Sequence, residues 1–185
     1  AYADDTLLIG SSSEHVSAFL CAVAEAGRSY GLQLHASKFQ LVQVAGACPV
    51  VHETGEIIPA SHAMSYLGSS VSADGRIGTE LSRKIGAAKA DFDRLQCVWR
   101  HSSATRLRKL EIYASLVESR LLYSLSSAVL LKSELRRLDG FQSKCLRKIL
   151  GIGPSYTSRV SNEKVRRRAG VRSPSENLFC RQLLF

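Results

Sequence analysis

Residues 1–9 read AYADDTLLI, and this stretch decides the fold that we predict. Asp4 and Asp5 are adjacent carboxylates at the head of an apolar run. Successive side chains of a strand point to opposite faces, so neighbouring aspartates converge on one ion only where the chain turns sharply. We therefore predict a β-hairpin. Paired carboxylates suit Mg2+, or Mn2+, together with a phosphate-bearing substrate, which indicates nucleotidyl transfer. A solvated turn is the alternative.

The charge of the chain is uneven along its length. Residues 1–99 carry seven Lys and Arg against ten Asp and Glu, whereas residues 100–185 carry eighteen against six. An asymmetry of this size indicates a polyanion partner for the second part of the chain. A basic surface that is merely solvated is the alternative.

Composition disfavours membrane, zinc and disulfide proteins. The longest apolar segment, residues 121–131, has eleven residues with three serines among them, too few to span a membrane, so we expect no membrane partner. The five cysteines form no C-x-x-C pair and the five histidines no i,i+4 pair, so we assign none of them to a metal or a disulfide. Unpaired cysteines are typical of a reducing compartment, which predicts a location inside the cell, in the cytoplasm or nucleus.

The first part of the chain predicts one helix and short strands. Ser11 and Glu14 have capping-box spacing, apolar residues follow at helical spacing, and Gly31 stops the helix, whose apolar stripe packs under the strands. Residues 31–44 predict two extended pieces joined by a polar turn at 35–38. Residues 49–59 predict a hairpin. Residues 64–71 predict one strand in which Gly68 allows close approach of another backbone, and a turn follows at 74–75.

Lys38, in the polar turn, is a candidate site residue. In phosphoryl transfer, a lysine beside the leaving pyrophosphate neutralises charge and donates a proton. Taken alone, Lys38 is better explained as a solvated surface lysine, because most lysines lie in water.

From Arg76 onward the apolar spacing predicts three helices in an antiparallel bundle. The stripe of the first runs from Ile77 to Leu95, with the basic residues Arg83, Lys84, Lys89 and Arg94 off the stripe. The second follows Ser103 and buries Leu107, Leu110, Ala114, Val117 and Leu121. The third buries Leu138, Phe141, Cys145 and Ile149 and presents Arg136, Arg137, Lys144, Arg147 and Lys148 to the outside. Residues 155–185 add short helices with a basic run at 164–168, which tracks a phosphate backbone or lies on a solvated face.

The order of these features resembles the reverse transcriptase of non-LTR (LINE-type) retrotransposons over nearly the whole chain. The matching segments, in order, are Tyr2-Ala3-Asp4-Asp5, Gly31-Leu32 with Lys38, Tyr66-Leu67-Gly68, residues 141–152, Ser161-Asn162-Glu163 and Arg168-Ala169-Gly170.

The resemblance implies a fold and a role for each segment. The fold is α+β: residues 1–75 are the C-terminal part of a polymerase palm, 76–153 a thumb-like helical bundle, and 154–185 a basic helical segment. Asp4 and Asp5 hold the metal ions, and Lys38 lies beside the leaving group. Tyr2, Ala3 and Tyr66-Leu67-Gly68 contact primer and template, as do the basic residues of the third bundle helix. The partners are an RNA template, a DNA primer and deoxynucleotide triphosphates.

Two positions depart from the family, and part of the family fold is expected upstream. His35 replaces an asparagine and Phe39 a threonine, which affects the geometry around Lys38. The fingers and the third metal-binding aspartate of the family belong to a missing N-terminal part of the same polyprotein. We therefore expect the chain to be inactive alone, because a two-metal site needs that carboxylate.

Two other hypotheses stay open. The chain is either a catalytically dead retroelement remnant that binds nucleic acid through its basic helices, or a helical protein-interaction domain. The first predicts salt-sensitive binding without a requirement for Mg2+, and the second predicts no salt-sensitive nucleic-acid binding at all.

Overall fold

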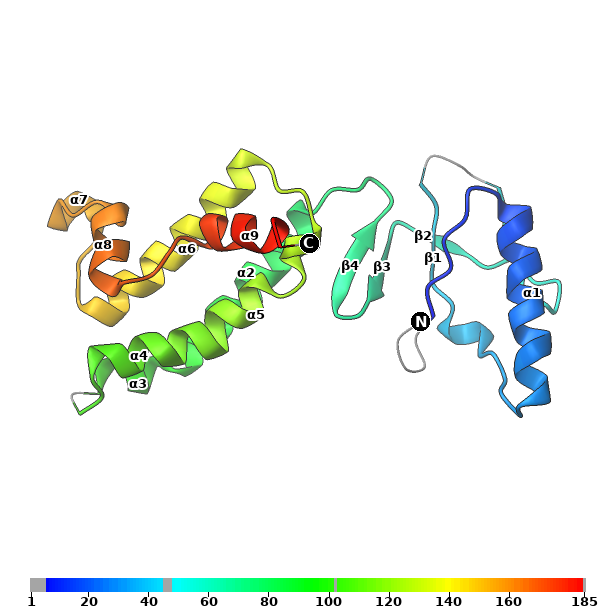
Figure 1. Cartoon of the computed structure of the whole chain (residues 1–185), viewed down its shortest axis with the longest axis horizontal. Helices are drawn as coiled ribbons and strands as arrows, with labels where there is room; N and C mark the ends of the chain where they lie inside the picture. Colours follow the sequence, from blue (N-terminus) through cyan, green and yellow to red (C-terminus); the bar gives the residue numbers. More distant parts are fainter. Residues whose placement is uncertain (1–5, 45–47, 102, 185) are drawn as a thin grey trace. The chain divides into compact units, whose positions relative to one another are not determined.

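The computed structural model describes residues 6–44, 48–101 and 103–184, and the chain divides into two compact units, residues 1–76 and 77–185 (Figure 1). The first unit combines helix with short strands, and the second is helical. The chain is therefore a mixed helix-and-strand protein, in agreement with the predicted α+β class. Within the described ranges, no helix is long and apolar enough to cross a membrane.

Helix α1, Ser13–Ser29, confirms the first predicted helix. Its end is the predicted one, because Gly31 takes a positive φ of 71° that ordinary residues rarely adopt. Its start differs from the prediction. Ser12 is the N-cap and its side chain makes no capping hydrogen bond, so the capping box expected from Ser11 and Glu14 is not formed.

Helix α1 packs on the segment that follows residue 48. It buries Leu20 and Ala24, and Ser17 Oγ accepts a hydrogen bond from the backbone N–H of Val51 at 3.0 Å. Residues 49–59 form the predicted hairpin, with a bridge between Val51 and Ile57 and a positive φ at Gly55.

The regular strands of this unit are short. Strand β1, Leu41–Val42, pairs in parallel with β2, Ala60–Ser61. The predicted polar turn is the 3-10 helix η1, Ala36–Lys38. Of the two extended pieces predicted in residues 31–44, only the second contains a paired strand, β1, and residues 6–10 and 32–34 carry no regular strand. Short apolar runs are ambiguous by pattern alone, because pairing depends on a partner strand.

The prediction of one continuous strand at 64–71 is also wrong. The segment is a hairpin of β3, Ala63–Tyr66, and β4, Ser69–Ser72, in which Tyr66 pairs with Ser69. Leu67 and Gly68 form the two-residue turn with φ values of 47° and 76°. A two-residue turn with both central φ angles positive matches the twist of the flanking strands, so Gly68 serves the turn and not a close approach of two backbones.

In the described residues of the helical unit, three long helical segments are followed by the short helices α7, α8 and α9 (Figure 1). The first segment is α2, Gly78–Arg94, followed by α3, Gln96–Arg100. The second is continuous through α4, Arg106–Ile112, the π-helical turn η2, Tyr113–Glu118, and α5, Ser119–Leu122, and leads to the 3-10 turn η3, Leu125–Ser127. The third is α6, Lys132–Leu150. Helices α7, Ser155–Ser158, α8, Asn162–Ala169, and α9, Pro174–Gln182, complete the unit.

These helices share one core. Successive long segments run in opposite directions (Figure 1), and their inward residues pack with residues from α8 and α9. Leu81 and Phe92 of α2, Leu138 of α6, Val165 of α8 and Leu178 of α9 are all buried in this cluster. Helices α8 and α9 therefore share the core of the three long segments that precede them.

The π-helical turn changes which face of the second segment is buried. Lys109, Tyr113, Val117 and Leu121 are buried at spacings of four, whereas Leu107 is 68% exposed and Ala114 is exposed. Four residues of a regular α-helix turn through about 40° more than a full turn, so side chains spaced by four gradually rotate away from the core. The wider π-helical turn keeps these four side chains on the same face. The predicted inward positions of Leu107 and Ala114 are wrong for this reason.

Candidate nucleic-acid interface

The predicted catalytic and metal-binding residues lie at the start of the chain. Tyr2, Ala3, Asp4 and Asp5 fall outside the described residues, so the hairpin and the Mg2+ or Mn2+ site remain predictions. In the described ranges, no group of three or more His, Cys, Asp or Glu side chains is placed to hold a metal ion.

Lys38 is the last residue of η1 and its side chain is exposed. The two positions that depart from the family flank this turn. His35 is the N-cap of η1, and its carbonyl accepts from Lys38 N at 3.0 Å. Phe39 is half-buried with its ring 5.2 Å from that of buried His52, in an edge-to-face arrangement. An aromatic residue after the lysine thus anchors the turn to the 49–59 hairpin.

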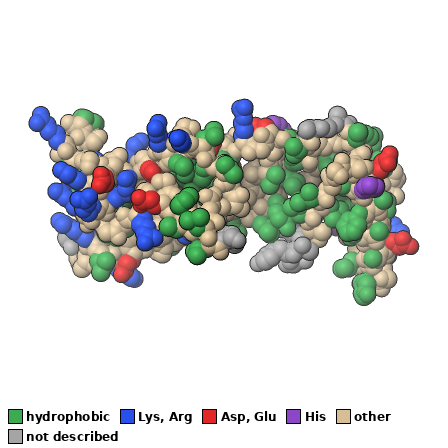
Figure 2. Space-filling model, turned by 45° about the horizontal axis from the view of Figure 1, so that its top comes forward, with side chains coloured by type: hydrophobic (Ala, Val, Ile, Leu, Met, Phe, Trp, Pro, Cys, Tyr) green, Lys and Arg blue, Asp and Glu red, His purple; other side chains and the backbone are tan. Residues whose placement is uncertain are grey.

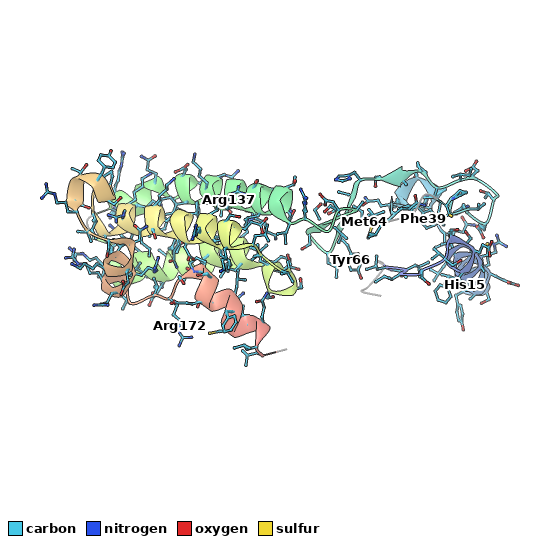
Figure 3. All side chains as sticks on the ribbon, turned by 90° about the horizontal axis from the view of Figure 1, so that it is seen from above. His15, Phe39, Met64, Tyr66, Arg137 and Arg172 are labelled. Carbon is cyan, nitrogen blue, oxygen red and sulfur yellow. The ribbon has the colours of Figure 1, made fainter. Side chains whose placement is uncertain are left out.

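The predicted primer-contacting residues Tyr66-Leu67-Gly68 form the tip of the β3–β4 hairpin (Figure 3). Gln40, two residues after Lys38, accepts a hydrogen bond from Ser65 N at 2.9 Å. The turn of Lys38 and the hairpin of Tyr66 are therefore linked through neighbouring residues. Leu67 is a bulky residue at positive φ, a conformation that is disfavoured and that occurs preferentially at functional sites.

Positive charge is concentrated in the helical unit. Residues 77–185 carry twenty-two Lys and Arg against nine Asp and Glu, whereas residues 1–76 carry three against seven. Figure 2 shows Lys and Arg side chains gathered over the helical unit, with a dense group at the end that holds α7 and α8. A field of this sign attracts polyanions and raises their association rates.

One row of these cations follows the seam between α2 and α6. Arg137 Nη2 donates to Ser82 Oγ at 2.9 Å (Figure 3 labels Arg137), and Lys148 Nζ lies 3.8 Å from Asp93 Oδ1. Ser82 and Asp93 mark the face of α2 that meets α6, and Lys89 lies between them at helical spacing. Lys144 follows Arg137 by two turns on α6. We call Lys89, Arg137, Lys144 and Lys148 the α2–α6 surface, and all four are exposed.

Arg147 does not belong to this surface, and the prediction that it points outward is wrong. It is only 7% exposed and makes five hydrogen bonds to described residues. Nη1 donates to the carbonyl of Gly153 at 2.8 Å, and Nη2 donates to the carbonyl of Val160 and to Asn162 Oδ1. Arg136, by contrast, is exposed as predicted. The segment after α6 folds back over Arg147, which helical spacing within α6 does not reveal.

Lys84 is a second cation that the prediction placed outside and that is buried, with 6% exposure. Its Nζ lies 3.5 Å from Glu80 Oε1 and 5.4 Å from the centre of the Tyr123 ring. Burial lowers the pKa of Lys84, while the hydrogen bond from Arg83 is the main cause that lowers the pKa of Glu80. Glu80 therefore engages both neighbouring cations.

A polar cluster lies inside the helical unit. Glu118, at the end of the π-helical turn, is buried and accepts hydrogen bonds from Asn177 Nδ2 at 3.0 Å and Gln142 Nε2 at 3.5 Å. Gln142 Nε2 also donates to the carbonyl of Arg172, and Gln142 Oε1 has no hydrogen-bond partner in the described part of the chain. Burial raises the pKa of Glu118 and outweighs the two amide donors. Helical spacing does not reveal this cluster, because each residue alone is an ordinary helix residue.

We expect Glu118→Gln to increase the free energy of unfolding at neutral pH. A raised pKa means that the folded protein binds this proton more tightly than the unfolded chain, so wild-type stability falls as pH rises above the unfolded-state value of about 4.3. The amide keeps the shape and needs no ionisation, so its advantage is largest near pH 7 and disappears near pH 4. Urea denaturation across this range, with the exposed Glu111→Gln as control, measures the effect. Lower stability of Glu118→Gln at neutral pH would contradict it.

No protein-family model matches the chain, and comparisons with curated proteins and with solved structures find no match.

Proposed function

We propose that the helical unit holds a template–primer duplex for a reverse transcriptase of the non-LTR retrotransposon type, and that the α2–α6 surface makes the main contact. The observation that carries this proposal is the row of four exposed cations along the contact between α2 and α6. One of them, Lys148, has the acidic neighbour Asp93. Cations in a row along the contact between two helices suit a phosphate backbone, whose charges repeat regularly along the duplex.

The chemistry of the proposal is nucleotidyl transfer. The primer 3′-hydroxyl gives its proton to water and its oxygen attacks the α-phosphorus of a deoxynucleotide, so a new P–O bond forms while the bond from the α-phosphorus to the oxygen bridging the β-phosphate breaks and pyrophosphate leaves. Asp4 and Asp5 would hold Mg2+ or Mn2+, which supplies charge stabilisation for such a displacement. Lys38 would lie beside the leaving group, and the exposed position of its side chain at the end of η1 supports that role. The Tyr66-Leu67-Gly68 tip would contact the primer.

The duplex contact is tested by replacing Lys89, Arg137 and Lys144 together with glutamine. Each phosphate contact contributes about 0.9 to the slope of log K against log salt concentration, so the slope falls by about 2.7 if all three contact phosphates. Affinity for the duplex falls on the order of a hundredfold near 0.15 M salt. Fluorescence anisotropy of a labelled RNA–DNA duplex at several salt concentrations measures both quantities.

The matched control replaces Arg100, Arg106 and Arg181 with glutamine, which removes the same charge from exposed positions elsewhere in the unit. An equal loss in both variants would show that net charge alone drives binding and would overturn the assignment to the α2–α6 surface. Binding with no salt dependence in the wild type would favour a protein-interaction domain.

The second candidate is a catalytically inactive nucleic-acid-binding module. Residues 77–185 are strongly basic and form a different compact unit from the one that carries Asp4, Asp5 and Lys38. This distribution of charge favours the second candidate. This candidate predicts the same salt-dependent duplex binding with no effect of Mg2+ or of an added deoxynucleotide. Tighter binding in the presence of both would support the polymerase.

A further inference from the structure

The α7–α8 corner, residues 153–169, is held in place by one buried side chain. The guanidinium of Arg147 donates to the carbonyls of Gly153 and Val160, to Ser158 Oγ at 3.2 Å and to Asn162 Oδ1 at 3.0 Å. Gly153 lies before α7, Ser158 is the last residue of α7, Val160 lies between α7 and α8, and Asn162 is the first residue of α8. The corner is thus a preorganised surface on the helical unit, fixed by bonds that a mobile loop lacks.

Helix α8 presents three cations on one face. Lys164, Arg167 and Arg168 have i, i+3, i+4 spacing and are exposed, while Val165 is fully buried. Arg167 pairs with Glu163 at 2.9 Å, with both side chains more than 70% exposed, so the pair is screened by water. Like charges at this spacing destabilise a helix. Arg167 and Arg168 lie in the last turn of α8, where the helix dipole favours cations, and the face they form with Lys164 is open to an anionic partner.

Arg159, between α7 and α8, adopts an unfavourable backbone conformation. Its φ is 53°, in the left-handed region that glycine or asparagine usually occupies, and its side chain is exposed. Gly151 and Gly170, at the ends of α6 and α8, fill the same kind of position without strain. An arginine where glycine fits better indicates that the guanidinium itself is used.

Tyr156 adds an exposed aromatic ring to the same corner, with 86% of the residue accessible. Sites for single-stranded nucleic acid combine exposed aromatic rings, on which bases stack, with cations that follow the phosphates. Helix α8 lacks the apolar outer face that a membrane-surface helix needs, because Val165 is buried and Ala169 is half-buried against the core.

We infer that the α7–α8 corner binds single-stranded nucleic acid, with Tyr156 stacking on a base and Arg159, Lys164, Arg167 and Arg168 contacting phosphates. This site shares none of the four residues of the α2–α6 surface, so the two contacts can be tested by different variants. Its recognition is independent of sequence, because stacking and phosphate contacts are available from every nucleotide.

Three variants of the full chain test the site, with anisotropy of a labelled twelve-nucleotide oligo(dT) strand and of a duplex as readouts. Tyr156→Ala weakens strand binding about tenfold with an unchanged salt slope and leaves duplex binding unaltered. The triple change Lys164→Gln, Arg167→Gln and Arg168→Gln lowers the salt slope for the strand by about 2, at about 0.7 per phosphate. Arg159→Gly weakens strand binding by about three- to fivefold while the melting temperature stays equal or rises, since glycine relieves the strain.

The outcomes separate this site from the duplex contact. Loss of strand binding in these variants, with duplex binding retained, supports the inference even if the α2–α6 variants show no effect. Unchanged strand binding in Tyr156→Ala, or equal losses for strand and duplex, would overturn it. If the triple change abolished binding to phosphatidylserine vesicles but left strand binding intact, the corner would be assigned to a membrane surface instead.

Discussion

Replacing Arg147 with methionine is expected to lower the free energy of unfolding by about 1 to 3 kcal/mol, the cost of leaving hydrogen-bond acceptors without their donor. The methylene stem keeps its packing in α6, but the carbonyls of Gly153 and Val160 and the Asn162 side chain lose their donor. Acceptors that lose their donor are costly to the extent that water does not reach them, and these residues are exposed or half-buried. Val165 of α8 is in the common core, so the loss affects the whole helical unit and not one loop.

Urea denaturation followed by far-ultraviolet circular dichroism measures this loss. The control is Arg136→Met, which makes the same change about three turns earlier on the same helix at an exposed side chain, where the expected change is within about 0.5 kcal/mol. Equal stability of the two variants would show that Arg147 does not support the corner. Anisotropy of the labelled strand with the same variant examines the strand site, because Arg147→Met removes the bonds that hold the surface carrying Tyr156 and Arg159.

Asp4→Asn is expected to abolish primer extension, with a decrease of at least about a thousandfold at saturating primer and template. Loss of one metal-binding carboxylate removes several kcal/mol of transition-state stabilisation, and each 1.36 kcal/mol is worth about a factor of ten. The measurement uses a polypeptide that carries residues 1–185 within their complete reading frame, with RNA template, DNA primer and Mg2+. Duplex affinity stays unchanged, because the α2–α6 surface is intact.

Glu25→Gln is the matched control for the aspartate, since it removes one negative charge from the exposed side of α1 in the same unit. We expect this variant to retain full activity. Full activity of Asp4→Asn would refute the polymerase assignment, whereas duplex binding without extension in both proteins would favour the inactive binding module.

Helices α1, α2 and α6 were predictable because each is long and strongly periodic. Leu81, Ala88 and Phe92 of α2 are buried as the apolar spacing predicts, and Gly151 ends α6 at positive φ. Such features depend on residues within a few turns of one another, which is the range over which helical pattern and capping act. The 49–59 hairpin was predictable for the same reason, because Gly55 lies between two extended pieces.

The candidate site was predictable in part. Arg136, Arg137, Lys144 and Lys148 are exposed on α6 as the spacing predicts, and their contact with nucleic acid stays a prediction. The roles of Asp4 and Asp5 likewise stay predictions. The strain at Arg159 and Leu67 was not predictable, because the sign of φ at a bulky residue depends on how the flanking segments are held.

The sequence by itself determined the position of its periodic helices, the basic character of residues 77–185 and the paired carboxylates at Asp4 and Asp5, because composition and local spacing suffice for these. Only the tertiary structure decided which cations face water. Arg147 and Lys148 are neighbours on one helix, yet the first is buried and the second is 45% exposed. The difference arises because the segment from Gly153 to Asn162 folds back over one side chain and not the other, a long-range contact that helical spacing does not encode.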